Sequence, residues 1–195
     1  MGDISMARKS KAKTGRKSAR KPARPTARKA AGKAAKPKAR KAPRPATAAL
    51  QSVTPYLVVS SGAHAIEFYK RAFDAVEVYR MPAPDGTRLL HATLNIRGSE
   101  LMLCDAFPEY GGNRGPDVVG NTTVTIHLWV PNADQAFAQA IAAGATVIMP
   151  LADMFWGDRY GKLRDPFGHE WSIAHHIRDV PPAEIAEAAR KMFPG

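Results

Sequence analysis

Two stretches of sixteen residues decide the fold: AHAIEFYKRAFDAVEV at 63–78 and ADQAFAQAIAAGATVI at 133–148. In both stretches apolar residues recur at spacings of three and four, which is typical of a helix with one buried face. The second helical pattern ends at Gly144, a residue suited to a helix end, Asp74 is its counterpart in the first stretch, and β-forming residues follow both. The two stretches align at an offset of 70 residues, so the chain contains an internal repeat.

Short runs of β-forming residues surround each predicted helix. The runs of the first repeat are 54–59, 76–81, 89–96 and 100–105, and those of the second are 123–130, 146–148, 160–164 and 170–174. The last two runs are joined by the turn Asp165-Pro166-Phe167-Gly168. Each repeat therefore predicts the order β-α-β-β-β, and the fold class is α+β. A terminal amphipathic helix over 183–193 is expected to act as a lid or as a dimer brace.

Charge divides the chain into two unlike parts. Residues 1–50 hold 17 of the 29 Lys and Arg residues and only one acid, Asp3, and no large apolar residue lies between Met6 and Leu50. Such a segment cannot offset the entropy of ordering. We therefore expect a disordered basic tail at 1–49, a folded domain at 50–178 and a C-terminal helical segment at 179–195. A single cysteine, Cys104, excludes a disulfide framework.

The tail has the composition of a flexible polycation, for which the natural ligand is a polyanion. We predict sequence-independent binding of nucleic acid through residues 7–45, and the alternative is a solubilising extension without a partner. No run is long and apolar enough to span a bilayer, so we expect a cytoplasmic protein without membrane contact, with nucleoid association as a further hypothesis. The basic residues proposed for this role include Lys21, Arg24, Arg28, Lys29, Lys36, Lys38, Arg40 and Lys41.

Several local motifs accompany the repeat. They are Thr54-Pro55-Tyr56-Leu57, Phe68-Tyr69, and the run from Phe155 through Gly161 to His169 that contains the Asp-Pro-x-Gly turn. With these motifs, residues 53–176 resemble the vicinal-oxygen-chelate superfamily of glyoxalases, bleomycin-resistance proteins and dioxygenases, and within it the PhnB-like branch. The resemblance implies two modules that form an incomplete barrel, a ligand cleft inside the curved sheet, and a homodimer.

Metal-dependent members of that superfamily bind a divalent ion through His or Glu side chains. The resemblance places the corresponding positions of this chain at Thr54, Thr125, Ser172 and within Leu101-Met102-Leu103. Hydroxyl and aliphatic side chains do not replace such a ligand set. We therefore expect no metal at the usual positions and no cofactor.

A displaced metal site is the alternative that the strand pattern leaves open. His127 shares a face with Thr125, Glu170 shares a face with Ser172, and His91 lies on a third strand. One divalent ion held by His91, His127 and Glu170 is a recognised type of ligand set. The competing interpretation is that His127 is a hydrogen-bonded histidine of a pocket or core.

The cleft is expected to combine aromatic rings with one cation. Trp156 and Tyr160 flank Arg159, and Trp129 lies in register with His127. Rings supply contact area, and an arginine can hold a carboxylate or a phosphate. The predicted lining consists of His91, His127, Trp129, Trp156, Arg159, Tyr160, Glu170 and Ser172.

Three functions follow from these patterns. The first is a metal-independent protein that binds a small aromatic or anionic molecule in the cleft. The second is a lyase, isomerase or dioxygenase that uses the displaced metal site. The third is a nucleic-acid-associated protein that acts through the tail. The sequence leaves open whether the cleft is catalytic.

Overall fold

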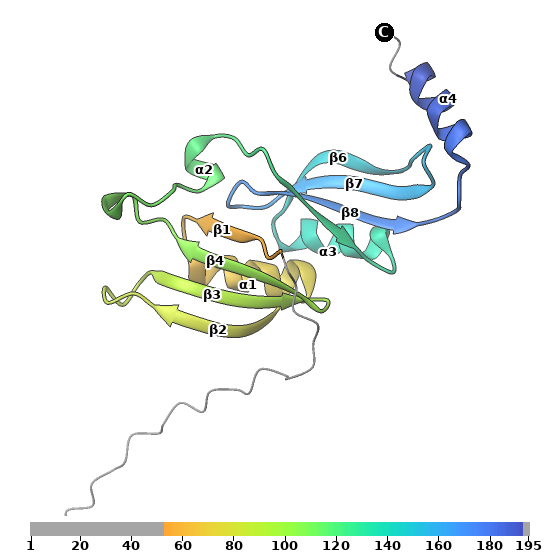
Figure 1. Ribbon diagram of the computed structural model, residues 1–195. Coiled ribbons are helices and arrows are strands. Elements are labelled where there is room, and N and C mark those ends of the chain that lie inside the picture. Colours follow the sequence, from red (N-terminus) through yellow and green to blue (C-terminus); the bar gives the residue numbers. More distant parts are fainter. Residues whose placement is uncertain (1–52, 193–195) are drawn as a thin grey trace, which may run out of the picture. The chain divides into compact units, whose positions relative to one another are not determined.

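Both repeats form the elements that their sequences predict. The computed structural model describes residues 53–192 (Figure 1), and the predicted tail lies outside this range. The first module is β1 (Tyr56–Val59), α1 (Gly62–Phe73), β2 (Val76–Pro82), β3 (Leu89–Ile96) and β4 (Ser99–Asp105). The second is β5 (Thr125–Trp129), α3 (Ala133–Ala143), β6 (Thr146–Asp153), β7 (Asp158–Arg164) and β8 (Glu170–His176). The linker contains the 3-10 turn η1 (Pro108–Tyr110) and the short helix α2 (Pro116–Val119), and α4 (Pro182–Met192) ends the described chain.

The helices of the two modules, α1 and α3, end in the same way. The residue after α1, Asp74, has φ 56°, and the residue after α3, Gly144, has φ 118°, so both adopt the left-handed conformation. At the other end of α3 the Asn132 side chain accepts a hydrogen bond from the Gln135 backbone N–H. The equivalence of Asp74 and Gly144 confirms the offset of 70 residues.

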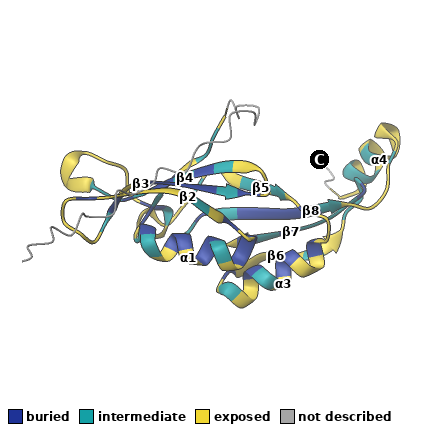
Figure 2. Cartoon of the chain, turned by 90° about the horizontal axis from the view of Figure 1, so that it is seen from below, coloured by how far each residue is buried: buried dark blue, intermediate teal, exposed yellow. Residues whose placement is uncertain are grey.

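The strands form two four-stranded sheets of identical topology. Their orders are β1-β4-β3-β2 and β5-β8-β7-β6, with the first and last strands of each module parallel. Figure 2 shows α1 and α3 together on one side of the strands, where they pack against each other. The opposite side of each sheet is the open face. The α+β prediction with two βαβββ modules is confirmed, and residues 53–192 form no closed barrel.

A buried carboxylate ties the two modules together. Asp165, in the predicted Asp-Pro-x-Gly turn, is 4% exposed. Its Oδ2 accepts hydrogen bonds from the Tyr69 hydroxyl at 2.7 Å and from the Trp171 indole N–H at 2.9 Å. Its Oδ1 accepts from the backbone N–H groups of Phe167 and His169. Four donors satisfy the carboxylate, which compensates for its burial.

The two modules differ in the turn before their last strand. In the first module the turn between β3 and β4 consists of Arg97 and Gly98 alone, both with positive φ, as a two-residue hairpin requires. In the second module five residues, 165–169, separate β7 from β8. The longer turn supplies the Asp165 contact to the other module, and the shorter turn has no counterpart to it.

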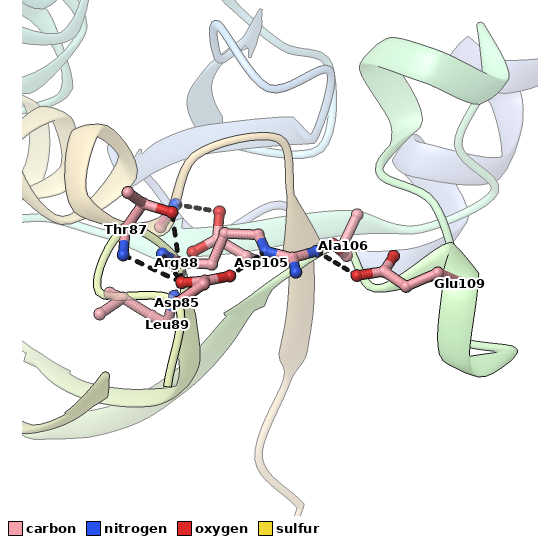
Figure 3. A network of polar contacts seen from close by, with 8 residues as sticks. Asp85, Thr87, Arg88, Leu89, Asp105, Ala106 and Glu109 are labelled. Carbon is pink, nitrogen blue, oxygen red and sulfur yellow. Dashed lines mark hydrogen bonds and ion pairs between the residues drawn. The ribbon is translucent and has the colours of Figure 1, made fainter. Parts of the chain in front are cut away.

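A second polar network closes one end of the first sheet (Figure 3). Asp105, at the end of β4, accepts hydrogen bonds from the backbone N–H groups of Gly62 and Leu89. Nearby, Arg88 forms ion pairs with Asp85 at 2.7 Å and Glu109 at 2.6 Å, and its guanidinium lies over the Phe107 ring. Backbone donors satisfy Asp105, and ion pairs engage Arg88, which indicates a structural role.

The C-terminal helix α4 has no buried residue. Ile185, Ala188 and Ala189 are its half-buried positions, so its role as a lid or dimer brace stays a prediction. Within residues 53–192 no helix has the length and apolar character needed to cross a membrane.

Candidate functional site

The open face of the second sheet carries the predicted cleft residues in three cross-strand rows. The strand register aligns His127 with Ser172 and Lys162, and it aligns Trp129 with Ala174 and Tyr160. A third row contains Thr125, Glu170 and Arg164. Residues paired across strands point to the same face, so the middle of this face is both aromatic and polar.

His127 stands at the centre of an aromatic group on this face. Its Nδ1 lies 2.8 Å from the hydroxyl oxygen of Ser172, a side chain that is 2% exposed. The imidazole is stacked with the Tyr160 ring, and it meets the Trp129 ring edge to face at 4.7 Å between centroids. Trp156 in turn contacts Tyr160 edge to face. We call His127, Trp129, Trp156, Tyr160 and Ser172 the His127 cluster.

Burial lowers the pKa of the His127 imidazole below its ordinary value, and Asp158 opposes this effect only in part. The imidazole is therefore neutral at pH 7, so one ring nitrogen donates a hydrogen bond and the other accepts one. His176 shows the opposite shift. Hydrogen bonds to Asp158 and Asp179 raise the pKa of its ring, which bridges the two carboxylates at 3.0 Å on each side.

An NMR titration of the histidine rings should separate these two residues. We expect His127 to titrate below its ordinary pKa of 6.5 and His176 to titrate above it. The Asp158→Asn variant should lower both pKa values, because Asp158 favours the protonated form of each ring. Equal titration of the two rings in the parent protein would contradict the described environments.

The sign of each contribution to stability follows from linkage. For His127 the unfolded chain binds the proton more tightly, so stability falls as the pH is lowered from about 6.5 toward the depressed pKa of the folded state. For His176 the folded state binds the proton more tightly. Its contribution is complete below pH 6.5 and is lost as the pH rises through the raised pKa.

Charged side chains beside the His127 cluster are already paired. Lys162 and Arg164 form ion pairs with Glu170 at 2.7 and 3.0 Å, and these contacts lower the pKa of the glutamate, with Lys162 the larger cause. The structure thus places Glu170 on the predicted face but engages its carboxylate. Lys162 was missed by the sequence reasoning, although strand alternation from Tyr160 places it on the same face.

Arg159 requires a correction. It lies opposite His175 in the register, and His175 accepts a hydrogen bond from the first backbone N–H of α3, so both side chains face the helix. The Arg159 guanidinium binds both carboxylate oxygens of Asp134 and also contacts Asp153. Arg159 is therefore on the opposite face of the sheet from the His127 cluster and is not available there to hold an anion.

His91 also lies apart from the His127 cluster, on strand β3 of the first sheet. Its Nδ1 is 3.1 Å from the Tyr56 hydroxyl, and its Nε2 is 3.0 Å from the Thr93 hydroxyl. Both ring nitrogens thus have partners. Tyr56 was not among the predicted site residues, although its alternation with Leu57 could have indicated the open face.

The residues of the described chain do not fit a metal ion. Between residues 53 and 192, no three His, Cys, Asp or Glu side chains are grouped in a way that could hold one. The displaced set of His91, His127 and Glu170 is not assembled, since His91 is on the other sheet and Glu170 is ion-paired. At the usual positions, Thr125 lies opposite Glu170, and the Ser172 hydroxyl contacts His127.

A cavity of about 330 Å³ adjoins the His127 cluster. His127 and Trp129 contribute to its wall, and Ile126 and Leu128 of the same strand line it as well. The remaining lining comes from the chain around Pro55, from the turn between β3 and β4, and from Trp171.

Comparison with known proteins identifies the family of this domain. The family model described as the Glyoxalase/Bleomycin resistance protein/Dioxygenase superfamily matches residues 49–173. The chain belongs to this superfamily. The Mycobacterium tuberculosis protein Rv0887c is 49% identical to it over 139 residues, which cover 70% of this chain and 81% of the relative.

Two solved structures share the fold of this domain. TioX from Micromonospora sp. ML1 is 30% identical, with a TM-score of 0.52 over 64% of this chain and 98% of TioX. The PhnB protein from Bacillus cereus shares the fold at 21% identity, with a TM-score of 0.51 over 64% of this chain and 99% of that protein. The shared fold agrees with the superfamily, and membership of the PhnB-like branch stays a prediction.

Proposed function

We propose that this glyoxalase-superfamily domain binds a small, uncharged aromatic molecule at the His127 cluster. The observation that carries the proposal is the grouping of three aromatic rings around one neutral imidazole on an open sheet face. Rings of this kind offer contact area for a planar ligand, and the imidazole offers one directed hydrogen bond.

Charge favours an aromatic ligand over an anionic one. Arg159, the cation expected to hold an anion, is engaged by Asp134 and Asp153 on the helix side of the sheet. Lys162 and Arg164 share the carboxylate of Glu170. An anionic ligand would have to displace one of these pairs, whereas an uncharged ring would not.

A panel of indole, naphthol and phenol fragments tests the proposal, with the tryptophan indole N–H signals as the readout. A ligand at the His127 cluster should shift the signals of Trp129 and Trp156 and leave Trp171 unchanged, because Trp171 is 1% exposed and hydrogen-bonded to Asp165. A fragment in the adjoining cavity would instead shift Trp129 and Trp171. Absence of shifts at both Trp129 and Trp156 across the panel would contradict the proposal.

The tail supports a second proposed function, association with nucleic acid. The supporting observation is the composition of residues 1–50, which hold 17 Lys and Arg residues and only one acid. Neutralising phosphates releases counterions, so binding to duplex DNA should weaken steeply with salt, with a log–log slope of roughly −0.9 per phosphate contact. We expect equal affinity for DNA of unrelated sequences, because the tail carries no aromatic residue to stack on bases.

A full-length variant with fewer positive charges in the tail provides the control for this function. Replacing Lys21, Arg24, Arg28, Lys29, Lys36, Lys38, Arg40 and Lys41 with glutamine removes eight positive charges. The salt slope measured by fluorescence anisotropy should then become shallower and the affinity should fall. If salt-sensitive binding is unchanged in this variant, the tail is not the binding element.

The homodimer that the resemblance implied stays a prediction. The open faces expose several large apolar or aromatic side chains that a second copy could cover, namely Tyr56, Tyr79, Met81 and Trp129.

A further inference from the structure

The contact between His127 and Ser172 has one arrangement that leaves no buried hydrogen without an acceptor. Ser172 is 2% exposed, and its hydroxyl oxygen lies 2.8 Å from Nδ1 of His127. Among residues 53–192, this nitrogen is the one hydrogen-bond partner of the Ser172 side chain. If Nδ1 carried the proton and donated it to Ser172, the hydroxyl hydrogen would be buried without an acceptor, which is costly. The hydroxyl therefore donates to Nδ1.

This direction of the hydrogen bond fixes the proton on the other ring nitrogen. A neutral imidazole has one nitrogen that donates and one that accepts, so Nε2 carries the hydrogen when Nδ1 accepts. Nε2 is at the tip of the ring, away from Cβ, and His127 is an exposed position of β5 although Nδ1 faces the buried Ser172. In the part of the chain that the structure describes, Nε2 has no hydrogen-bond partner. The ring thus presents an N–H donor to the open face.

The other polar groups on this face strengthen its donor character. The indole groups of Trp129 and Trp156 are donors only. The carboxylates on the same face are already engaged, because Glu170 accepts from two cationic side chains and Asp158 is paired with a histidine. A ligand at the His127 cluster therefore meets donors that need an acceptor, and the carboxylates that could receive a ligand hydrogen have partners.

The histidine of the first open face differs in this respect. Nδ1 of His91 lies 3.1 Å from the Tyr56 hydroxyl, and Nε2 lies 3.0 Å from the Thr93 hydroxyl. Both nitrogens of His91 are used within the protein, whereas His127 has one such contact. The donor available to a ligand is therefore on the second sheet.

We propose that Ser172 is a positioning residue that holds His127 in the Nε2–H form, and that the His127 cluster thereby selects aromatic ligands with a carbonyl group over those with only hydrogen-bond donors. An aryl ketone or a quinone has this chemistry, since it combines a flat ring with a neutral oxygen that accepts a hydrogen bond. The choice of ligand class rests on the proposed function, whereas the position of the proton on His127 does not.

The nitrogen spectrum of His127 tests the role of Ser172 without a ligand. Long-range proton–nitrogen correlation spectra of the full-length protein at about pH 8, where an imidazole of ordinary pKa is neutral, identify the ring nitrogen that carries the proton. We expect Nε2 in the parent protein and in Ser172→Thr, which keeps the hydroxyl, and a mixture of both forms in Ser172→Ala. The matched control Thr93→Val removes the hydroxyl beside His91 and should leave the His127 signals unchanged. Protonation of Nδ1 in the parent, or the parent pattern in Ser172→Ala, would overturn the proposal.

Three bicyclic probes of similar size test the ligand class. The probe 1-indanone carries only an acceptor, indole carries an N–H donor, and indane carries neither. In calorimetric titrations of the parent protein we expect 1-indanone to bind roughly tenfold more tightly than indane, as one net hydrogen bond provides, and indole to bind no more tightly than indane. Ser172→Ala should reduce the preference for 1-indanone, because His127 can then also turn an acceptor toward the ligand. Equal Kd values for 1-indanone and indane, or tighter binding of indole than of 1-indanone, would refute the selection.

These results distinguish the inference from the proposed function. If Nε2 carries the proton but none of the three probes shifts the indole signals of Trp129 and Trp156, the proposed function fails together with the ligand class, and the role of Ser172 stands. If all three probes shift those signals with equal affinity, the proposed function stands and the selection for a carbonyl group is refuted.

Discussion

Replacing Asp165 with alanine is expected to lower the free energy of unfolding by about 4 kcal/mol, the largest effect of any single substitution considered for this domain. The change removes the acceptor for the Tyr69 hydroxyl, the Trp171 indole and two backbone N–H groups in a site from which water is excluded. Each buried donor left without a partner costs roughly 1–3 kcal/mol. Urea denaturation followed by tryptophan fluorescence measures the loss.

Two further variants test whether the loss of stability comes from the buried hydrogen bonds of Asp165. Asp153→Ala makes the same chemical change at an exposed carboxylate that pairs with Arg159, and it should cost less than about 1 kcal/mol. Tyr69→Phe removes only one of the four donors, so an intermediate loss of about 1.5–3 kcal/mol is expected for a hydrogen bond to a charged group. A loss for Asp165→Ala no greater than that for Asp153→Ala would show that the buried carboxylate does not hold the modules together.

Removal of the Trp129 ring should have the largest effect on ligand binding. For the fragment that binds most tightly, Trp129→Ala is expected to raise the Kd by roughly 30-fold, which corresponds to about 2 kcal/mol for loss of an aromatic contact at the centre of a binding surface. Trp129 is 57% exposed, so its truncation leaves the core intact. Isothermal titration calorimetry measures the change in Kd.

The control for this result is another exposed aromatic residue. Tyr110, at the end of η1, is 83% exposed, and it is neither part of the His127 cluster nor of the adjoining cavity. Tyr110→Ala should leave the Kd unchanged. The proposal is contradicted if both variants bind the fragment as tightly as the parent protein.

The fold could be predicted because the repeat fixes it twice. The helix periodicity and the helix ends at Asp74 and Gly144 depend on neighbouring residues, and such local signals survive without knowledge of tertiary contacts. Only part of the role of the Asp-Pro-x-Gly turn could be predicted. The sequence predicts a turn there, but the contact of Asp165 with Tyr69 joins residues 96 positions apart, which no local pattern reveals.

Part of the site could be predicted because strand alternation is also a local signal. Alternation along β5, β7 and β8 correctly brings His127, Tyr160 and Ser172 to one face. Alternation also places Arg159 and Tyr160 on opposite faces of the sheet. The prediction grouped Arg159 with its aromatic sequence neighbours and did not apply alternation to it. His91 shows a different limit. The repeat assigns its strand to the first module, but no local pattern says whether its side chain meets those of the second module.

The aromatic contacts between the modules determine when the core can form during synthesis of the chain. Tyr69 and Phe73 of α1 pack against Trp171, which the ribosome adds about a hundred residues later. Until then the growing chain carries an incomplete hydrophobic surface on its first helix, a state that favours engagement by chaperones. The first half of the gene product therefore cannot reach its final packing alone, and the domain completes its fold only after translation has passed β8.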